Sequence, residues 1–290
     1  SHRIGRFDSV GWLKEVCAIL RRTNLTPAYY LPPDIDREKC AVLLFGEDNV
    51  PAALAKVAWG SRELSQAWRE RSGIAFYQHR EIRDFRVPDV RYAGEYDGRS
   101  YTLFSPIPPD ARMAPTKWTD VYQRCWTEMA NSTMQHTPLS QLDWWSATGQ
   151  FDHTWRQIIE FVENHEPDGG YRFYSAHGDF APWNARVLSD SLFLFDWEGF
   201  EPQAPLFLDP FYFAFSREVL VRKQRDLTRA ASAINKMLHS APLRLEPADV
   251  LLAQIYLKVN LEGDSLKGAL DSLARLAIRD ERAVDARQGK

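Results

Sequence analysis

The octapeptide "HGDFAPWN", residues 177–184, places an acid and an amide five positions apart among small and apolar residues. Its flanks, Tyr-Arg-Phe-Tyr at 171–174 and Ala-Arg-Val-Leu at 185–188, have the composition of strands. The sequence therefore predicts a short turn between two strands that presents the side-chain oxygens of Asp179 and Asn184. Taken alone, the two residues are equally well explained as caps of the turn.

A second acid stands at a matching place further along the chain. Asp196 comes twelve residues after Asn184, directly after the apolar run "SLFLF" at 191–195. A hairpin would bring Asn184 and Asp196 to one rim, although Asp196 alone is also explained as a strand-end cap. Two oxygen ligands without a His or Cys cluster suit a hard cation such as Mg²⁺. Asp179, beside this rim, would accept a proton from an attacking hydroxyl or orient it.

The lysine of "AALAKVA", residues 52–58, is a candidate ligand of phosphate groups. A metal-binding Asn and Asp, an Asp facing the nucleophile and a distant strand lysine are the parts of a phosphoryl-transfer site. Lys56 needs an acidic partner, and the following predicted helix offers Glu63 and Glu70. Glu70 is favoured because it lies further inside the helix. The alternatives are an edge-strand lysine that blocks aggregation for Lys56 and a solvated helix residue for Glu70.

The order of predicted elements divides the chain into two lobes. Residues 1–104 read as a small β-rich lobe with one helix at 61–83. Four prolines in residues 105–115 predict a stiff, non-helical connector. Residues 116–290 read as a larger, mainly helical lobe that contains the octapeptide. The predicted fold class is α+β.

Composition bounds the function only loosely. The chain has 290 residues and a formal net charge of −3, so it carries no general electrostatic attraction to nucleic acid or to anionic membranes. No apolar stretch reaches the length of a membrane span. The three cysteines are far apart, which argues against a disulfide framework and favours a reducing, cytoplasmic location. Composition does not predict an oligomeric state.

The paired motifs resemble those of a known group of enzymes. "HGDFAPWN" followed by "LFDWE" is similar to the catalytic and metal-binding motifs of the aminoglycoside phosphotransferase and choline kinase superfamily, small-molecule relatives of protein kinases. His177-Gly-Asp179 stands where protein kinases have His-Arg-Asp, and Asp196-Trp-Glu198 stands where they have Asp-Phe-Gly. The resemblance is close over about 175–212. It implies a protein-kinase-like fold with the active site between two lobes.

The resemblance also implies a role for individual residues near the phosphates. Asp179 would be the catalytic base or the group that orients the acceptor hydroxyl. Asn184 and Asp196 would bind Mg²⁺. Lys56 would contact the α- and β-phosphates of ATP or GTP and pair with Glu70.

Other positions would support this centre. The backbone near Leu103 and Ser105, just before Pro106 of the connector, would hold the adenine. His177 would brace the loop by hydrogen bonding, and Asp209 in "PLFLDPFYF" would support the loop structurally. Glu198 matches a glutamate of the choline kinase branch, for which a direct role is open.

The implied activity is transfer of the γ-phosphoryl group of ATP or GTP to a hydroxyl of a small molecule, and we favour a sugar or amino sugar. The sequence departs from the motifs of this superfamily at one place, and this departure supports an alternative function. Residues 29–46, where a glycine-rich phosphate loop is expected, hold a single late glycine. This favours a non-catalytic, nucleotide-binding scaffold. A protein kinase is disfavoured by Gly178 in place of arginine and by the twelve residues between Asp196 and Asp209, which leave no room for an activation segment.

Overall fold

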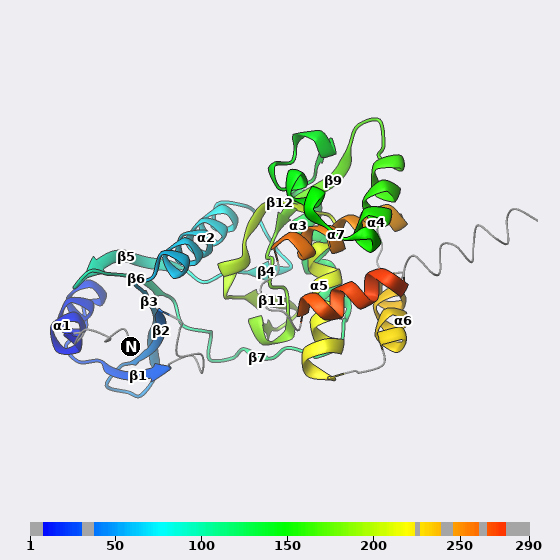
Figure 1. Ribbon diagram of the computed structural model, residues 1–290. Helices are drawn as coiled ribbons and strands as arrows, with labels where there is room; N and C mark the ends of the chain where they lie inside the picture. The colour runs from blue at the N-terminus through cyan, green and yellow to red at the C-terminus, as the bar shows by residue number, and fades with distance from the viewer. Residues whose placement is uncertain (1–7, 31–37, 224–226, 239–245, 261–265, 277–290) are drawn as a thin grey trace, which may run out of the picture.

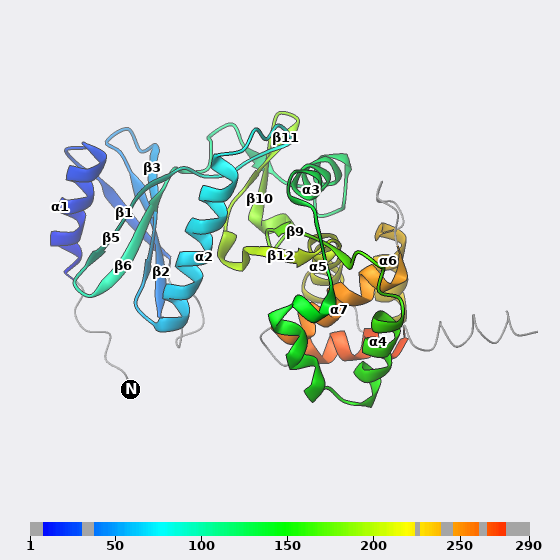
Figure 2. The ribbon, with the colours of Figure 1, turned by 90° about the horizontal axis from the view of Figure 1, so that it is seen from above.

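The computed structural model describes residues 8–30, 38–223, 227–238, 246–260 and 266–276. Its N-terminal part is an antiparallel sheet in the order β1-β2-β3-β6-β5. The strands are β1 (Thr26–Tyr30), β2 (Lys39–Phe45), β3 (Pro51–Ala58), β5 (Val90–Tyr96) and β6 (Arg99–Phe104). Helix α1 (Ser9–Leu20) lies on one face of this sheet and α2 (Ser61–Gln78) on the other (Figures 1 and 2). Part of the expected phosphate-loop segment, residues 31–37, lies outside the described residues.

Alternation along β3 decides which side chains face the site. Ala55 and Val57 are buried in a hydrophobic core with Trp12 and Val16 of α1. Because successive side chains of a strand point to opposite faces, Lys56 lies on the face that carries α2. The small core on one side therefore fixes the lysine on the other.

Helix α2 packs mainly against the second part of the chain. Ile74 and Tyr77, near its end, are fully buried in the larger of two hydrophobic cores. The Tyr77 hydroxyl donates a hydrogen bond to the carbonyl of Ser175. The larger core thus includes α2, although α2 precedes the connector 105–115 in the sequence. The helix carries Glu70 between the two cores.

The helix predicted over 61–83 is shorter than expected, because α2 ends before the last five of those residues. The backbone N–H groups of Arg83 and Asp84 donate to the carboxylate of Glu128, at 2.7 and 2.8 Å. The next residues form β4 (Phe85–Arg86), which pairs in parallel with β11 (Ser191–Leu194). These long-range contacts hold residues 83–86 in a non-helical conformation.

Beyond the N-terminal sheet the structure contains two small sheets, in the orders β4-β11-β10-β7 and β12-β9-β8, and β4 is the one strand among them that precedes the connector. Their further strands are β7 (Arg112–Met113), β8 (Gln135–Thr137), β9 (Tyr171–Ala176), β10 (Ala185–Leu188), β11 (Ser191–Leu194) and β12 (Glu201–Pro205). The three strands predicted around the octapeptide are confirmed as β9, β10 and β11. The connector 105–115 is free of helix, as expected, and contributes the short strand β7.

Helices form most of the remaining structure. They are α3 (Asp120–Thr133), α4 (His153–Asn164), α5 (Leu208–Ser216), α6 (Leu227–Leu238) and α7 (Pro247–Asn260), with a π-helical stretch at Arg217–Val221 and helical residues 266–276. An antiparallel sheet followed by a helix-rich part confirms the predicted α+β, kinase-like class (Figure 1). Within the described ranges, no helix combines the length and the hydropathy that crossing a bilayer demands.

Candidate active site

Gly178 holds the octapeptide against the neighbouring turn. Its φ is +80°, in the left-handed region that favours glycine, and a Cβ there would lie 1.8 Å from the carbonyl oxygen of Gly199. No side chain fits this contact without a shift of the backbone. Glycine at this position therefore lets the turn that carries Asp179 approach the turn that carries Asp196.

Asp209 holds the start of the octapeptide through two backbone hydrogen bonds. This fully buried residue lies in the first turn of α5, and its carboxylate accepts the backbone N–H groups of His177 and Gly178, both at 2.9 Å. Burial raises the pKa of Asp209 to about 6, although the Tyr174 hydroxyl and the two N–H groups favour the charged form. Its contacts match the expected supporting place, since they are with backbone only one and two residues from Asp179.

His177 braces the same loop from the other side. Its ring is fully buried. Nδ1 lies 3.3 Å from the backbone nitrogen of Asp179, whose N–H it accepts, so Nε2 carries the proton and donates to the carbonyl of Phe195 at 3.1 Å. Burial lowers the pKa of His177 to about 4. A neutral ring with both nitrogens engaged is suited to hold the loop and not to exchange protons.

Asp179 has one carboxylate oxygen held and one unpartnered. The side-chain amide of Asn184 donates to Oδ2 of Asp179 at 2.9 Å and to its carbonyl at 3.0 Å. Among the described residues, Oδ1 is buried and has no hydrogen-bond partner. Burial raises the pKa of Asp179 to about 7, opposed by the hydroxyl of Tyr212 and the amide of Asn184. A buried acceptor without a partner, on a carboxyl that titrates near neutrality, is suited to take a hydroxyl proton.

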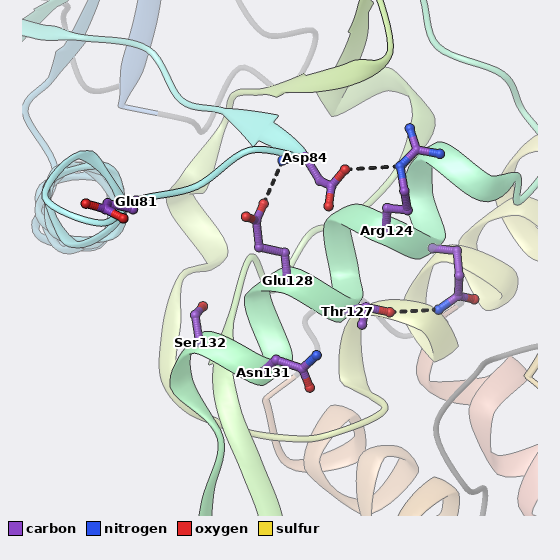
Figure 3. A pocket seen from close by; sticks show the side chains of 8 residues that line it. Glu81, Asp84, Arg124, Thr127, Glu128, Asn131 and Ser132 are labelled. Atoms are coloured by element: carbon purple, nitrogen blue, oxygen red, sulfur yellow. Dashed lines mark hydrogen bonds and ion pairs between the residues drawn. The ribbon is translucent and has the colours of Figure 1, made fainter.

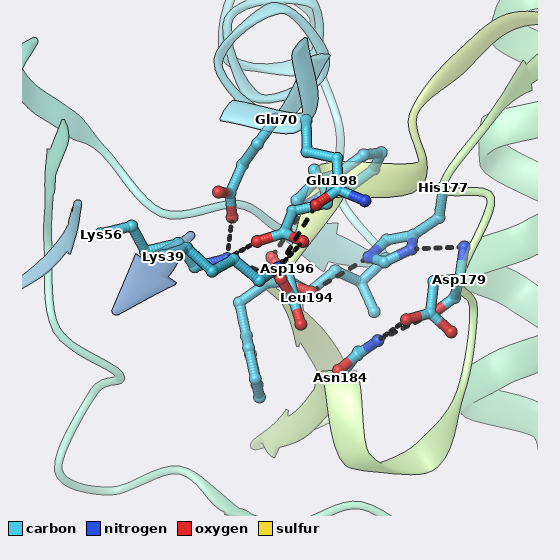
Figure 4. A network of polar contacts seen from close by, with 12 residues as sticks. Lys39, Lys56, Glu70, His177, Asp179, Asn184, Leu194, Asp196 and Glu198 are labelled. Carbon is cyan, nitrogen blue, oxygen red and sulfur yellow. Dashed lines mark hydrogen bonds and ion pairs between the residues drawn. The ribbon is translucent and has the colours of Figure 1, made fainter. Parts of the chain in front are cut away.

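The β10–β11 hairpin brings the two predicted metal ligands to the same end of the sheet. Ala185 pairs with Leu194, and the Phe195 N–H donates to the carbonyl of Asn184 at 3.1 Å. Asp196 follows at once, with φ at +66°, a conformation that aspartate tolerates better than most residues. Because the amide nitrogen of Asn184 faces Asp179, its side-chain carbonyl is left without a hydrogen bond within the described ranges (Figure 4).

A cluster of charges lies beside this hairpin end, across the boundary between sheet and hairpin (Figure 4). The ammonium of Lys56 lies 2.7 Å from Glu70, 2.6 Å from Asp196 and 3.3 Å from Glu198. Burial disfavours the charged form of Lys56, but the three carboxylates outweigh it and raise its pKa above the ordinary value. The predicted pairing of Lys56 with Glu70 is thus confirmed. Ion pairs of Lys56 within the described residues do not include Glu63.

The donor set of this cluster fits a hard cation. Carboxylate oxygens of Glu70, Asp196 and Glu198 lie within 4.8 Å of one another. The free side-chain carbonyl of Asn184 stands at the same hairpin end. All of these ligands are oxygens, which suits Mg²⁺.

Lys39, at the start of β2, is part of the cluster and was not predicted from the sequence. Its ammonium forms an ion pair with Glu198. A lysine that opens an apolar strand is also typical of a solvated strand end, so the sequence held no signal that distinguishes the two. Glu198 itself thus contacts two lysines, Lys39 and Lys56.

A cavity of about 180 Å³ runs from this cluster between the sheet and the hairpin. Its lining is apolar except at one end and consists of Leu54, Lys56, Glu70, Pro88, Phe104, Ser105, Ile107, Phe193, Phe195 and Asp196. Ser105 is in this wall, with its N–H bound to the carbonyl of Asp89 at 2.8 Å. Leu103 is buried inside the sheet and pairs with Ala55 and Tyr92. The cavity therefore has an apolar end suited to a base and a charged end suited to phosphates.

No protein-family model and no curated protein matches the sequence. Solved structures do match. A thermostable mutant of aminoglycoside phosphotransferase APH(4)-Ia, in complex with AMP-PNP and hygromycin B, aligns with a TM-score of 0.57 and 12% identity over 93% of this chain and 98% of that chain. The chain has the aminoglycoside phosphotransferase fold. The amicoumacin kinase hAmiN with AMP-PNP, Ca²⁺ and Ami aligns with a TM-score of 0.51 and 11% identity over 93% of each chain. APH(2″)-IIia with GDP and kanamycin aligns with a TM-score of 0.52 and 9% identity over 93% of this chain and 99% of that chain.

Within this phosphotransferase fold, a second and larger cavity of about 600 Å³ lies between α3 and the segment that carries Glu81 and Asp84 (Figure 3). Its polar groups largely satisfy one another: Arg124 pairs with Asp84 at 3.0 Å, and Glu128 accepts backbone N–H groups. None of the predicted site residues lines it. The chemistry-bearing side chains instead gather at the smaller cavity.

Proposed function

We propose that this protein is a small-molecule kinase that transfers the γ-phosphoryl group of ATP or GTP to a hydroxyl group. The observation that carries the proposal is the carboxylate of Asp179, which is buried and has one oxygen without a hydrogen-bond partner in the part of the chain that the structure describes. It belongs to the loop that also supplies Asn184, and that loop ends beside the Lys56 cluster. A scaffold protein that only binds nucleotide does not need a buried carboxylate that can accept a proton.

The smaller cavity would take the nucleotide. Leu54, Phe193 and Phe195 would pack against the base, and the connector side of the cavity, at Ser105, would meet its edge. Lys56 would contact the α- and β-phosphates at the charged end. Glu70, which follows Lys56 by 14 positions, would hold the ammonium of Lys56 in the cavity through their ion pair.

A magnesium ion bound by the carbonyl oxygen of Asn184 and the carboxylate of Asp196 would neutralise charge on the phosphates. The other residues have separate tasks. Asp179 would accept the acceptor's proton while the acceptor oxygen bonds to the γ-phosphorus. The bond from that phosphorus to the β–γ bridging oxygen would break, and ADP or GDP would leave with the oxygen. His177 and Asp209 would hold the loop in place.

The acceptor is a sugar or amino-sugar hydroxyl in our proposal. Support comes from structures of the same fold that contain hygromycin B or kanamycin beside a nucleotide or its analogue. At 9–12% identity these structures support the fold and leave the pocket chemistry open to variation. The acceptor should therefore be sought with a broad panel of candidate compounds.

The rival, a nucleotide-binding scaffold without turnover, is favoured by the scarcity of glycine in residues 29–46. The deciding experiment measures release of ADP or GDP with a panel of sugars, amino sugars and amino alcohols. We expect acceptor-dependent release in the wild type and a release rate about 10²- to 10⁴-fold lower in Asp179→Asn. A wild type that binds ATP or GTP but phosphorylates nothing in the panel would favour the scaffold.

A further inference from the structure

Lys39 reaches from the first residue of β2 to a carboxylate 159 positions later in the chain. Its ammonium pairs with Oε2 of Glu198 and lies 3.4 Å from the side-chain oxygen of Gln66 on α2. The side chain is only 19% exposed, whereas a lysine at a strand end is usually solvated. Three elements thus hold this long, flexible side chain in the charge cluster, whose members Lys56, Glu70 and Asp196 line one end of the smaller cavity.

The sheet register places Lys39 and Lys56 together. Ala41 stands directly opposite Lys56, and Lys39 stands opposite Ala58. Residues two apart on a strand share a face, so the two lysines are diagonal neighbours on the face that carries α2. Both ammonium groups meet at Glu198, one on each oxygen.

The balance of charge shows what the second lysine does. Glu70, Asp196 and Glu198 place three carboxyl groups around the ammonium of Lys56. Lys39 adds a second positive charge, so the net charge of the cluster is one unit less negative than it would be without this lysine. An anionic phosphate chain entering here would meet stronger repulsion if Lys39 were absent.

The sequence before β2 explains why a side-chain cation is needed. Glycine-rich loops bind phosphate through closely spaced backbone N–H groups. Residues 29–39 contain two prolines, which lack that N–H, and no glycine. Lys39 is the last residue of this stretch and the only lysine in it.

We propose that Lys39 is a second phosphate-contacting residue, which exchanges Glu198 for the β- or γ-phosphate when the nucleotide binds. The inference rests on the proposed use of ATP or GTP. The exchange leaves no buried charge unpaired, because Glu198 keeps its contact with Lys56 and Lys39 gains an anionic partner. Lys39 thereby takes over part of the task of a glycine-rich loop.

The test compares affinities for nucleoside, monophosphate, diphosphate and triphosphate by calorimetry on the full chain with Mg²⁺. Lys39→Met keeps the aliphatic stem and removes the charge. We expect it to weaken triphosphate binding about 10- to 100-fold, the loss of one charge-assisted hydrogen bond, and to leave nucleoside binding unchanged. Lys39→Arg keeps the charge and should retain most of the preference for triphosphate. Lys14→Met, an exposed position of α1, is the matched control and should behave as wild type.

The phosphate series separates this role from a structural one. If Lys39→Met weakens nucleoside and triphosphate by the same factor, Lys39 only holds the two parts together and the inference is wrong. If the wild type prefers triphosphate and Lys39→Met keeps that preference, the inference fails while the proposed function stands. A wild type that binds no nucleotide overturns both. Thermal unfolding checks the fold, and Lys39→Gln, whose amide can still donate to Glu198, replaces the methionine variant if that one does not fold.

Discussion

At the scale of single residues, Asp179 separates chemistry from binding. Asp179→Asn keeps the shape of the side chain but removes the proton acceptor. We expect phosphoryl transfer to fall about 10²- to 10⁴-fold, with nucleotide affinity nearly unchanged, because Asp179 would face the acceptor in the proposed mechanism. Asp190→Asn, in the exposed β10–β11 turn, is the control for the same chemical change. Loss of nucleotide binding or of the fold in Asp179→Asn would show that the residue only caps its turn.

Asp196 should reveal the metal through binding measurements alone. The Asp196→Asn variant removes one carboxylate from the Lys56 cluster and one proposed Mg²⁺ ligand. Without magnesium, the variant should bind ATP at least as well as wild type, because one repulsive charge is gone. With magnesium, wild type should gain affinity and the variant should not, and turnover should be lost. Equal magnesium enhancement in both proteins would remove Asp196 from the metal site.

His177 should make stability depend on pH. Its pKa is about 4 in the folded protein against an ordinary 6.5, because the ring is buried. Below pH 6.5 His177 binds a proton in the unfolded chain, whereas in the folded chain it binds one only near pH 4. The stabilisation is therefore complete above pH 6.5 and is lost as pH falls to 4, by up to about 3 kcal/mol. Urea unfolding should show His177→Asn approaching wild type over this range, and a constant gap would contradict the burial argument.

The residues that sequence could identify are those whose spacing is local. Asp179, Asn184 and Asp196 lie within one strand–turn–hairpin unit, and the structure places them there. Lys39 escaped because its only signal is a contact with Glu198, which depends on how the sheet docks on the hairpin. The contact joins residues 159 positions apart, so the sequence around Lys39 carries no pattern that predicts it.

At the scale of elements, the same distinction applies to helix ends. The strands around the octapeptide were predictable because apolar runs and turn residues alternate there. The end of α2 was not, because the N–H groups of Arg83 and Asp84 are claimed by Glu128 on α3, 44 or 45 positions away. The spacing that predicted the helix continues to residue 83, five residues past Gln78, at which α2 ends.

Glu128 should accordingly stabilise the junction between α2 and β4. Glu128→Ala leaves two backbone N–H groups without their acceptor, which we expect to cost about 1–3 kcal/mol of unfolding free energy. Chemical denaturation measures this directly. Glu160→Ala, at an exposed position of α4, is the matched control and should change stability by less than about 0.5 kcal/mol. Equal effects of the two substitutions would mean that the junction does not depend on Glu128.

At the scale of the whole molecule, a few residues carried the prediction of the fold. The paired motifs span a small part of the chain, yet the phosphotransferase fold extends over 93% of it at 12% identity. Most of the other buried residues belong to two hydrophobic cores, and hydrophobic cores in general accept many different apolar sequences. The acceptor pocket could not be predicted for the same reason, since the C-terminal helices carry no local motif.

The cavity between the two parts makes nucleotide binding a test of the whole arrangement. A nucleotide that contacts Leu54 and Lys56 on the sheet and Phe195 and Asp196 on the hairpin should tie the two cores together. At a concentration 100-fold above its dissociation constant it stabilises the folded state by about 2.7 kcal/mol, which corresponds to a rise in Tm of about 4 °C for a chain of 290 residues. Thermal unfolding should show this rise with ATP or GTP and Mg²⁺, and a smaller rise with EDTA in place of the metal. An unchanged Tm at millimolar nucleotide would mean that the cavity does not bind it.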